Sequence, residues 1–210
     1  MPYKKKLPVR TAERFFLYAR FLKAKQNLGA ENVFSHELSL AVGISPEQVR
    51  QDLMILNIRG TPQKGYAINA FLAELNIFLR MGEPVKAILA GAGNMGRALL
   101  SVFSSSRPNL QIAAAFDYNL LENGKKIAGC PVYHFSMMPE ILRIEKPAIG
   151  IIAVPPEFAQ QIADGMSSAG IKGILNFSLS AIKSPPGVFL EQVDILMALE
   201  KTAFFAREGL

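Results

Sequence analysis

The feature that most limits the possible fold is the glycine-rich segment GAGNMG at residues 91–96. It follows the apolar run VKAILA and precedes RALLSVF, a pattern typical of a strand, a tight turn and a helix. The next apolar run, IAAAFD at 112–117, ends on an acidic residue about twenty positions after the loop. This context predicts a Rossmann domain, an α/β fold with a doubly wound parallel sheet that binds a dinucleotide.

Each part of the loop has an expected role at the cofactor. Gly93 would let the backbone approach a pyrophosphate, and Gly96 would let the helix pack closely on the strand. Asp117 would accept hydrogen bonds from the ribose hydroxyls and repel a 2′-phosphate, which favours NAD(H) over NADP(H). The alternatives are a purely structural turn and an ordinary strand-end carboxylate. The cofactor-binding candidates of the loop are Gly91, Ala92, Gly93, Asn94, Met95 and Gly96.

Two later strands, AIGIIAV at 148–154 and IKGILNF at 171–177, continue the alternation of strand and helix. Ligands of open α/β sheets bind beyond the carboxyl ends of the strands. Residues at those ends are therefore candidates for the nicotinamide side of the site, with loop packing as the alternative. They are Val154, Pro155, Asn176 and Phe177.

Residues 84–210 are nearly all used by the nucleotide fold, which leaves no separate substrate domain and no evident acid–base set. His134 has no evident partner, and a lone histidine is more often structural. We therefore expect no catalytic residue and favour sensing over turnover, the rival being a small NAD-dependent oxidoreductase. A single cysteine, Cys130, and two distant histidines predict no structural metal.

The positive charge is confined to the first part of the chain. Residues 1–80 hold twelve Lys or Arg against six Asp or Glu, whereas residues 81–210 hold eleven of each. This asymmetry suggests a polyanionic partner, although basic solvated faces are also common. The sequence has neither a signal-peptide pattern nor an apolar run long enough for a membrane span, so a soluble, cytoplasmic protein is expected.

Three helices are expected in this basic part, one over about 11–26, one from Ser35 to Gly43 and one from Ser45 onward. The first would present Phe15, Phe16, Leu17, Phe21 and Leu22 as one apolar stripe. Ser35 and Ser45 would be N-caps, the latter followed by Pro46 at the first helical position. Two helices joined by VGI indicate a helix-turn-helix, with a plain three-helix bundle as the nearly equal alternative.

The third helix would bury Val49 and Leu53 and turn Gln48, Arg50 and Gln51 outward toward base edges. The segment RGTPQKGY at 59–66 is a basic turn that would form the wing of a winged helix, and a further helix is expected over about 69–79. The lysines at 4–6 would meet phosphates. The candidates for DNA contact are Arg10, Ser45, Gln48, Arg50, Gln51, Arg59, Lys64 and Tyr66.

These patterns predict a winged-helix DNA-binding domain at 1–80, a Rossmann NAD(H)-binding domain at 84–192 and a C-terminal helix at 193–210. That helix has Ile195, Leu196, Leu199, Ala203 and Phe204 on one apolar side. It would dock either on a partner subunit or on its own sheet.

The order of a helix-turn-helix, GAGNMGRALL, AAFD, PVYH, IIAVPPE, AGIKGILNFS and a terminal VD-led helix resembles the Rex family of redox-sensing transcriptional repressors. The resemblance covers nearly the whole chain. It implies a homodimer that binds an inverted-repeat operator in double-stranded DNA, exchanges its C-terminal helices and is released by NADH. It also assigns Arg50 to the first contact of the recognition helix, Asp117 to the ribose, and Arg14 with Asp194 to a charged pair that relays state between domains.

The chain departs from the family pattern at four positions. Gln51 stands for a lysine, Met54 for a serine and Pro62 for an arginine of the wing, which predicts a different operator sequence or affinity. Val102 stands where a tyrosine is common near the nicotinamide, so a hydroxyl that would report the redox state of the ring is missing. A regulator that binds NAD but has altered or lost DNA specificity is therefore a further alternative.

Overall fold

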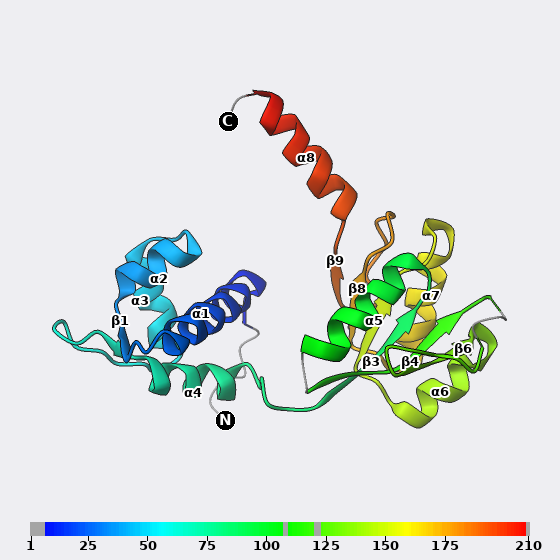
Figure 1. Cartoon of the computed structure of the whole chain (residues 1–210), viewed down its shortest axis with the longest axis horizontal. Coiled ribbons are helices and arrows are strands. Elements are labelled where there is room, and N and C mark those ends of the chain that lie inside the picture. Colours follow the sequence, from blue (N-terminus) through cyan, green and yellow to red (C-terminus); the bar gives the residue numbers. More distant parts are fainter. Residues whose placement is uncertain (1–6, 107–108, 120–122, 209–210) are drawn as a thin grey trace. The chain divides into compact units, whose positions relative to one another are not determined.

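The computed structural model describes residues 7–106, 109–119 and 123–208, so the lysines at 4–6 lie outside the described residues. The chain divides into two compact units, Met1–Glu83 and Pro84–Leu210. Figure 1 shows the helical first unit and the sheet-containing second unit. Each unit is described by itself below.

In its described residues, the first unit has four helices and a small antiparallel sheet. Its sheet pairs β1 with β2, in the register Asn32 with Ala67 and Val33 with Tyr66. In chain order its elements are α1 (Val9–Asn27), β1 (Asn32–Val33), α2 (Ser35–Val42), α3 (Pro46–Ile55), β2 (Tyr66–Ala67) and α4 (Ile68–Phe78).

Helix α1 buries a stripe that differs from the predicted one. Phe15, Tyr18, Ala19 and Leu22 are buried, at the i, i+3, i+4, i+7 spacing of one helical face. Phe16 and Leu17, which were predicted on the stripe, are exposed, because Phe16 lies beside that face and Leu17 nearly opposite it. The core of the unit is completed by buried apolar residues of α3 and α4, including Val49 and Leu53 as predicted.

The helix-turn-helix is formed by α2, a short turn and α3. Gly43 ends α2 in the left-handed conformation, which glycine adopts without strain. Ser45 is the N-cap of α3, and its hydroxyl accepts a hydrogen bond from the Gln48 N–H at 3.2 Å. The predicted N-cap of α2 is wrong by one residue, since Phe34 holds that position and its N–H donates to the Glu37 carboxylate at 2.8 Å.

The wing is a tight turn between α3 and β2. The backbone of Thr61 and Gly65 exchanges two hydrogen bonds, of 3.1 and 2.8 Å, around the exposed tip at 62–64. A Cβ at Gly60 would collide with the Gly65 carbonyl and the Tyr66 ring, so this turn needs its glycine. The basic turn predicted at 59–66 thus has the geometry of a wing.

The second unit is a seven-stranded sheet with the strand order β5-β6-β4-β3-β7-β8-β9. Without β5, which pairs antiparallel with β6, the strands are parallel and follow the 3-2-1-4-5-6 order of a Rossmann fold. The strands are β3 (Val85–Ala90), β4 (Leu110–Asp117), β5 (Lys126–Ile127), β6 (Cys130–His134), β7 (Ile149–Ile152), β8 (Gly173–Asn176) and β9 (Phe189–Gln192). The helices are α5 (Asn94–Ser106), the 3₁₀ turn η2 (Phe135–Met137), α6 (Met138–Glu145), α7 (Pro156–Ser168) and α8 (Ile195–Glu208).

Both faces of the central strands are covered. Along β3, Ile88 and Ala90 join a core with residues of α6 and α7, whereas Ala87 and Leu89 join a second core with residues of α5. Residues 87–90 of β3 are buried on both faces, which explains why they are all apolar, whereas Lys86 at the start of the strand is exposed. The order of the strands reverses at β3, so the crevice for a ligand lies at the carboxyl ends of β3 and β7, next to residues 91–96.

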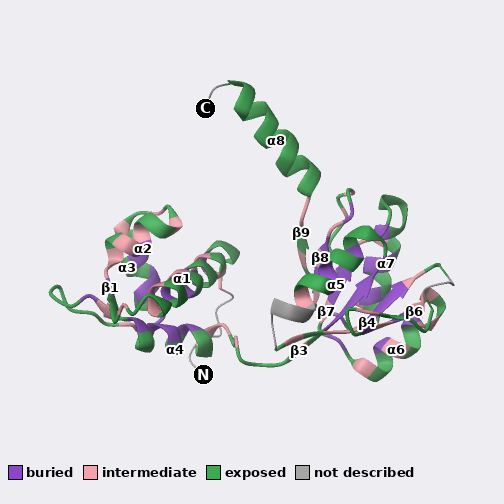
Figure 2. Cartoon of the chain, viewed as in Figure 1, coloured by how far each residue is buried: buried purple, intermediate pink, exposed green. Residues whose placement is uncertain are grey.

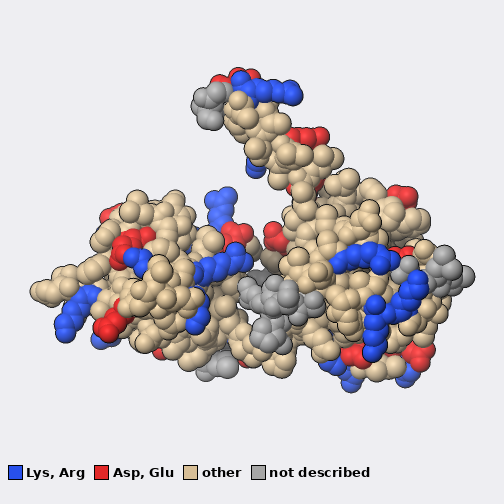
Figure 3. Space-filling view, in the orientation of Figure 1, with Lys and Arg blue, Asp and Glu red and all other residues tan. Residues whose placement is uncertain are grey.

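Helix α8 contributes nothing to these cores. In the described part of the chain, all of its residues are exposed, including Leu199 and Phe204 on its apolar side (Figure 2). The alternative that it packs on its own sheet is therefore wrong. The face of α8 drawn in Figure 3 is also mainly uncharged.

Candidate dinucleotide and DNA sites

Gly91 and Gly96 shape the loop from within the protein. Gly91 has φ of +97°, and a Cβ there would collide with the Ala153 carbonyl of the neighbouring strand end. A Cβ at Gly96 would collide with the Gly91 carbonyl, so the first turn of α5 approaches the loop as closely as its backbone permits. The structure thus gives both glycines a steric reason that involves no ligand.

Gly93 is different, because a Cβ there would meet no protein atom within 4 Å. It is exposed, in a loop with a left-handed φ only at Gly91, and it lies immediately before α5 begins at Asn94. Neither protein packing nor backbone strain explains this glycine. Close approach of a ligand to the loop backbone does explain it, and the N-terminus of α5 offers N–H groups and a positive dipole end to phosphate oxygens. The residues present therefore fit a dinucleotide pyrophosphate.

Asp117 ends β4 beside this loop. Its Oδ2 accepts a hydrogen bond from the Ala92 N–H at 2.7 Å, and its Oδ1 accepts one from the Asn119 N–H at 2.8 Å. These bonds fix the carboxylate against the glycine loop. Each carboxylate oxygen has a second lone pair, so the group retains capacity for two ribose hydroxyls.

An aromatic cluster lies immediately after Asp117 and was not singled out as a site from the sequence. The Tyr118 ring stacks on Phe135 with centroids 4.3 Å apart and also contacts Phe158 at 5.7 Å. Tyr118 and Phe158 are both partly exposed. Because these rings come from three segments far apart in the sequence, the loop after β4, η2 and the first turn of α7, no local sequence pattern could reveal them. They offer an apolar platform next to the carboxylate, of the kind on which an adenine ring packs.

The four candidates at the other strand ends divide into two kinds. Val154 is buried, Pro155 is the exposed N-cap of α7 and Phe177 is half-buried. Asn176 is fully buried, and both of its amide donors are used within the chain, one by the Ser180 carbonyl and one by Gln192. The structure therefore gives Asn176 a role in holding the loop after β8 against β9.

Helix α3 carries its exposed polar side chains on one face. Arg50 and Gln51 are exposed as predicted. Gln48 is not, and its prediction as an outward residue is wrong because its amide donates to the Asp52 carboxylate at 3.1 Å. Buried carboxylates need hydrogen-bond donors, and Gln48 supplies one of them.

Asp52 is the centre of a buried polar network that joins α1 to α3. Its fully buried carboxylate accepts two hydrogen bonds from Arg14, Nε at 2.6 Å and Nη2 at 2.7 Å, and one from the Tyr18 hydroxyl at 2.9 Å. The bond to Asp52 raises the pKa of Arg14, and burial together with Asp52 raises the pKa of Tyr18 above its ordinary value. Arg14 is thus engaged inside its own unit, while Asp194 caps α8 by accepting from the Met197 N–H at 2.7 Å.

The remaining DNA candidates lie at the surface of the first unit. Arg10 is exposed in the first turn of α1, and Arg59 and Lys64 are exposed on the wing. Tyr66 is half-buried against the core of the unit, so only part of its ring remains for a ligand.

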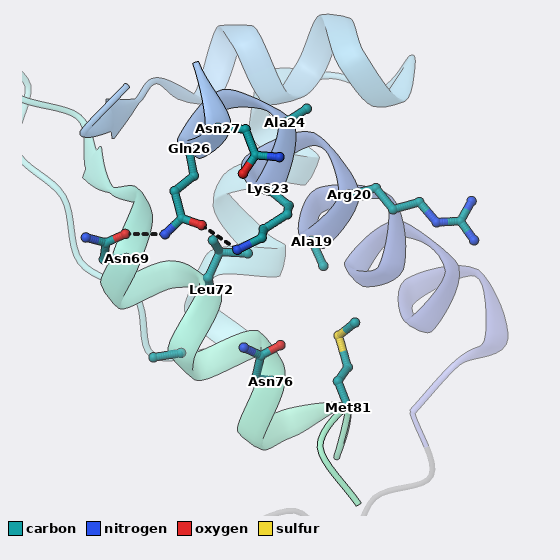
Figure 4. A pocket seen from close by; sticks show the side chains of 11 residues that line it. Ala19, Arg20, Lys23, Ala24, Gln26, Asn27, Asn69, Leu72, Asn76 and Met81 are labelled. Atoms are coloured by element: carbon teal, nitrogen blue, oxygen red, sulfur yellow. Dashed lines mark hydrogen bonds between the residues drawn. The ribbon is translucent and has the colours of Figure 1, made fainter. Parts of the chain in front are cut away.

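A separate groove of about 770 Å³ lies between α1 and α4, where Lys23 donates to Gln26 at 2.8 Å and Gln26 donates to Asn69 at 2.6 Å (Figure 4). It shares no lining residue with α3 or with the glycine loop.

Comparison with known proteins decides the family. The model of a putative DNA-binding protein N-terminus matches residues 6–53, and the model of a CoA binding domain matches residues 83–180. The redox-sensing transcriptional repressor Rex of Pelotomaculum thermopropionicum is 38% identical over 199 residues, which cover 95% of this chain and 93% of that protein. The Rex of Desulforamulus reducens is 34% identical, with 95% of both chains covered.

The chain belongs to the Rex family of redox-sensing transcriptional repressors. A solved structure of RSP, a Rex-family repressor, is 29% identical with a TM-score of 0.86 and covers 98% of this chain and 96% of that one. RSP in complex with β-NAD⁺ and operator DNA gives a TM-score of 0.89, with 98% and 95% covered. The Rex fold accounts for the N-terminal DNA-binding region, the Rossmann domain and the terminal helix, and its members are repressors rather than enzymes.

The positions where the sequence was expected to depart from the Rex pattern are at the surface. Met54 is 73% exposed on α3, Pro62 is at the tip of the wing, and Val102 is 55% exposed on α5. None of these three residues is needed for the core of its unit. Changes at these positions would therefore affect the surface of each unit rather than its core.

Proposed function

We propose that this Rex-family chain binds NAD(H) at the GAGNMG loop and operator DNA through α3 and the wing, and that NADH releases it from DNA. The observation that carries the proposal is that a Cβ at Gly93 would meet no protein atom, so that packing within the protein does not explain the glycine and a bound ligand does. The same chain has an exposed polar face on α3, the second helix of the helix-turn-helix. RSP, which is similar over 98% of this chain, has been solved with β-NADH and with β-NAD⁺ and operator DNA.

The proposed cofactor contacts follow from the site. The N–H groups of residues 91–96 would bind the pyrophosphate, Asp117 the adenosine ribose, and Tyr118 with Phe158 the adenine. Val154, Pro155 and Phe177 would line the nicotinamide side, and Asn176 would hold their loop in place. The Asp117 carboxylate would repel a 2′-phosphate, which favours NAD(H) over NADP(H).

The proposed DNA contacts are of two kinds. Arg50 and Gln51 would meet base edges in the major groove, since both present planar groups that can make two hydrogen bonds at once. Arg10, Arg59 and Lys64 would meet phosphates and position the domain, with Ser45 and part of Tyr66 at the edge of the contact.

We further propose a homodimer that acts on DNA in the cytoplasm. Helix α8 exposes Ile195, Leu199 and Phe204 in the described chain, and a stable helix rarely leaves such a face uncovered. Exchange of α8 between two copies, as the Rex resemblance implies, would cover it. A dimer also matches the two-fold symmetry of an inverted repeat. No helix in the described part of the chain has the length and apolar content that a membrane span needs.

We also propose that Arg14 and Asp194 form a charged pair that relays state between the domains. The network around Asp52 suggests how such a pair would act on α3. Arg14 holds the recognition helix through Asp52. If Arg14 instead bound Asp194 in one state of the dimer, α3 would lose part of its anchor to α1. Such an exchange of partners would couple the position of α8 to the DNA-binding surface.

The proposed function is tested by selecting bound sequences from a random pool of double-stranded DNA, with NADH, with NAD⁺ and with neither. The proposal expects an inverted repeat in the absence of NADH and its depletion when NADH is present. A chain that selects no sequence would be a regulator that has lost DNA specificity, and one that oxidises NADH steadily with a small carbonyl compound would be an oxidoreductase.

A further inference from the structure

The exposed face of α3 is narrower than the predicted recognition surface, and it contains an acid. Gln48 is turned in toward Asp52, and Val49, Asp52 and Leu53 are buried. The exposed residues that remain along the helix are Glu47, Arg50, Gln51 and Met54, at the i, i+3, i+4, i+7 spacing of one stripe. Whatever DNA groove receives Arg50 therefore also receives Glu47.

Glu47 and Arg50 form an ion pair on this stripe. Arg50 Nη2 donates to Glu47 Oε1 at 2.7 Å, and the two side chains are 52% and 69% exposed, respectively. An exposed pair of this kind contributes little to stability, because water solvates both charges and two long side chains must be ordered. Hydrogen bonds from its own N–H and from Ser45 also lower the pKa of Glu47, so it remains a carboxylate.

A second explanation for Glu47 is its place at the N-terminus of α3, where a negative charge is favourable. That effect requires only a carboxylate in the first turn. The helix-terminus effect does not explain why Glu47 is aligned with Arg50. It also does not explain an anion on a surface that faces phosphates, because a negative charge there reduces the affinity for DNA.

We propose that Glu47 is a specificity-determining residue of the DNA interface, which reads a cytosine next to a guanine read by Arg50. This inference rests on the proposed DNA-binding function. Arginine only donates hydrogen bonds and matches guanine O6 and N7, whereas a carboxylate only accepts and matches the N4 amino group of cytosine. Thymine places the O4 acceptor where cytosine has its amino group, so the carboxylate rejects thymine.

The geometry sets the spacing of the two bases. Three residues along a helix advance about 4.5 Å, and one base pair advances about 3.4 Å. Glu47 and Arg50 therefore match neighbouring base pairs. In the structure the ion pair places the two side chains next to each other on the exposed stripe, which is the arrangement that neighbouring base pairs would contact.

The experiment compares the full chain with Glu47→Gln, in which a neutral amide of nearly the same shape can either donate or accept. Glu74→Gln is the matched control, since Glu74 is an exposed acid on α4, away from the recognition helix. Random-pool selection with the wild type gives the operator, and selection with Arg50→Ala identifies the guanine position as the one whose preference is lost. Fluorescence anisotropy then measures each protein on the operator and on a copy with thymine in place of the adjoining cytosine.

We expect the wild type to prefer cytosine over thymine and Glu47→Gln to reduce that preference about tenfold, the size of one polar base contact. Glu74→Gln should keep the wild-type preference, and thermal unfolding should show that the wild type and the three variants are folded. An equal gain in affinity of Glu47→Gln for both operators would mean that Glu47 only repels phosphates and would overturn the inference. The inference would also be overturned if Glu47→Gln lost the preference for guanine and kept that for cytosine, because Glu47 would then only position Arg50. If the wild type selects no sequence, the proposed function itself fails.

Discussion

The buried network around Asp52 makes a quantitative prediction about the DNA-binding unit. The substitution Asp52→Asn keeps the size of the side chain and removes its charge. In the structure the carboxylate accepts four hydrogen bonds, from Arg14 Nε and Nη2, Tyr18 and Gln48, and all of them are 3.1 Å or shorter. An asparagine offers one acceptor oxygen, and its amide group would face donors at the other position.

The cost follows from the burial of the partners. Asp52 is fully buried and the Arg14 side chain is only 16% exposed, so the substitution leaves a largely desolvated guanidinium without its counter-charge. Breaking a buried ion pair from one side costs about 3–5 kcal/mol. Because one acceptor oxygen remains and Arg14 keeps some contact with water, we expect the low end of this range, about 3 kcal/mol. A domain is stable by only about 5–15 kcal/mol, so the effect is large.

Hydrogen exchange followed by mass spectrometry can measure this loss locally in the full chain. Peptides from α1 and α3 should exchange with an opening free energy lower by about 3 kcal/mol, whereas peptides from β3 and β7 in the other unit should be unchanged. Glu74→Gln, which removes one exposed negative charge from α4, is the control. If the opening free energy of α1 and α3 fell by less than about 0.5 kcal/mol, the network would not stabilise this unit. Its ion pair would then contribute no more than an exposed one does.

Three further predictions address single residues. Gly93→Ala and the control Gly82→Ala should both leave the free energy of unfolding unchanged, since a Cβ meets no protein atom at either position. In calorimetry, Gly93→Ala alone should weaken the binding of NADH about tenfold, because the added methyl group crowds the pyrophosphate; an unchanged affinity would mean that the loop is not part of the site. Glu37→Gln should cost about 1 kcal/mol near neutral pH in urea unfolding. Lys25 and a backbone N–H lower the pKa of Glu37 in the folded state. The stabilisation is therefore complete above the ordinary glutamate pKa and is lost as the pH falls through the pKa of Glu37 in the folded protein. A difference in the free energy of unfolding between Glu37→Gln and the wild type that persisted in acid would contradict this. Burial raises the pKa of Cys130 to about 11, so iodoacetamide at neutral pH should label it slowly in the folded chain and rapidly in urea, and equal rates would show that the thiol is exposed.

Features with short-range causes could be predicted from the sequence. Gly91 and Gly96 lie within one turn of the chain that only glycine can form, and the strand and helix around them have apolar patterns of their own. Ser45 and Pro46 likewise mark the start of α3 by chemistry confined to one helical turn. The order of these local signals was enough to predict the helix-turn-helix, the Rossmann sheet and the family.

Features that depend on partners distant in the sequence could not be predicted. Gln48 reads as an outward polar residue until Asp52 is known to be buried and bound to Arg14 from another helix. The Tyr118 platform needs Phe158 from the first turn of α7, forty residues later. The hairpin of β5 and β6 has strands too short to show a period, since β5 is only two residues long.

The measurement that tests the central claim most directly is the affinity of the full chain for its selected operator at saturating NADH, at saturating NAD⁺ and without nucleotide, by fluorescence anisotropy at one fixed salt concentration. The proposed mechanism predicts that NADH weakens operator binding far more than NAD⁺ does, and that operator DNA weakens NADH binding by the same factor. Equal operator affinity with and without NADH would contradict redox sensing by this chain.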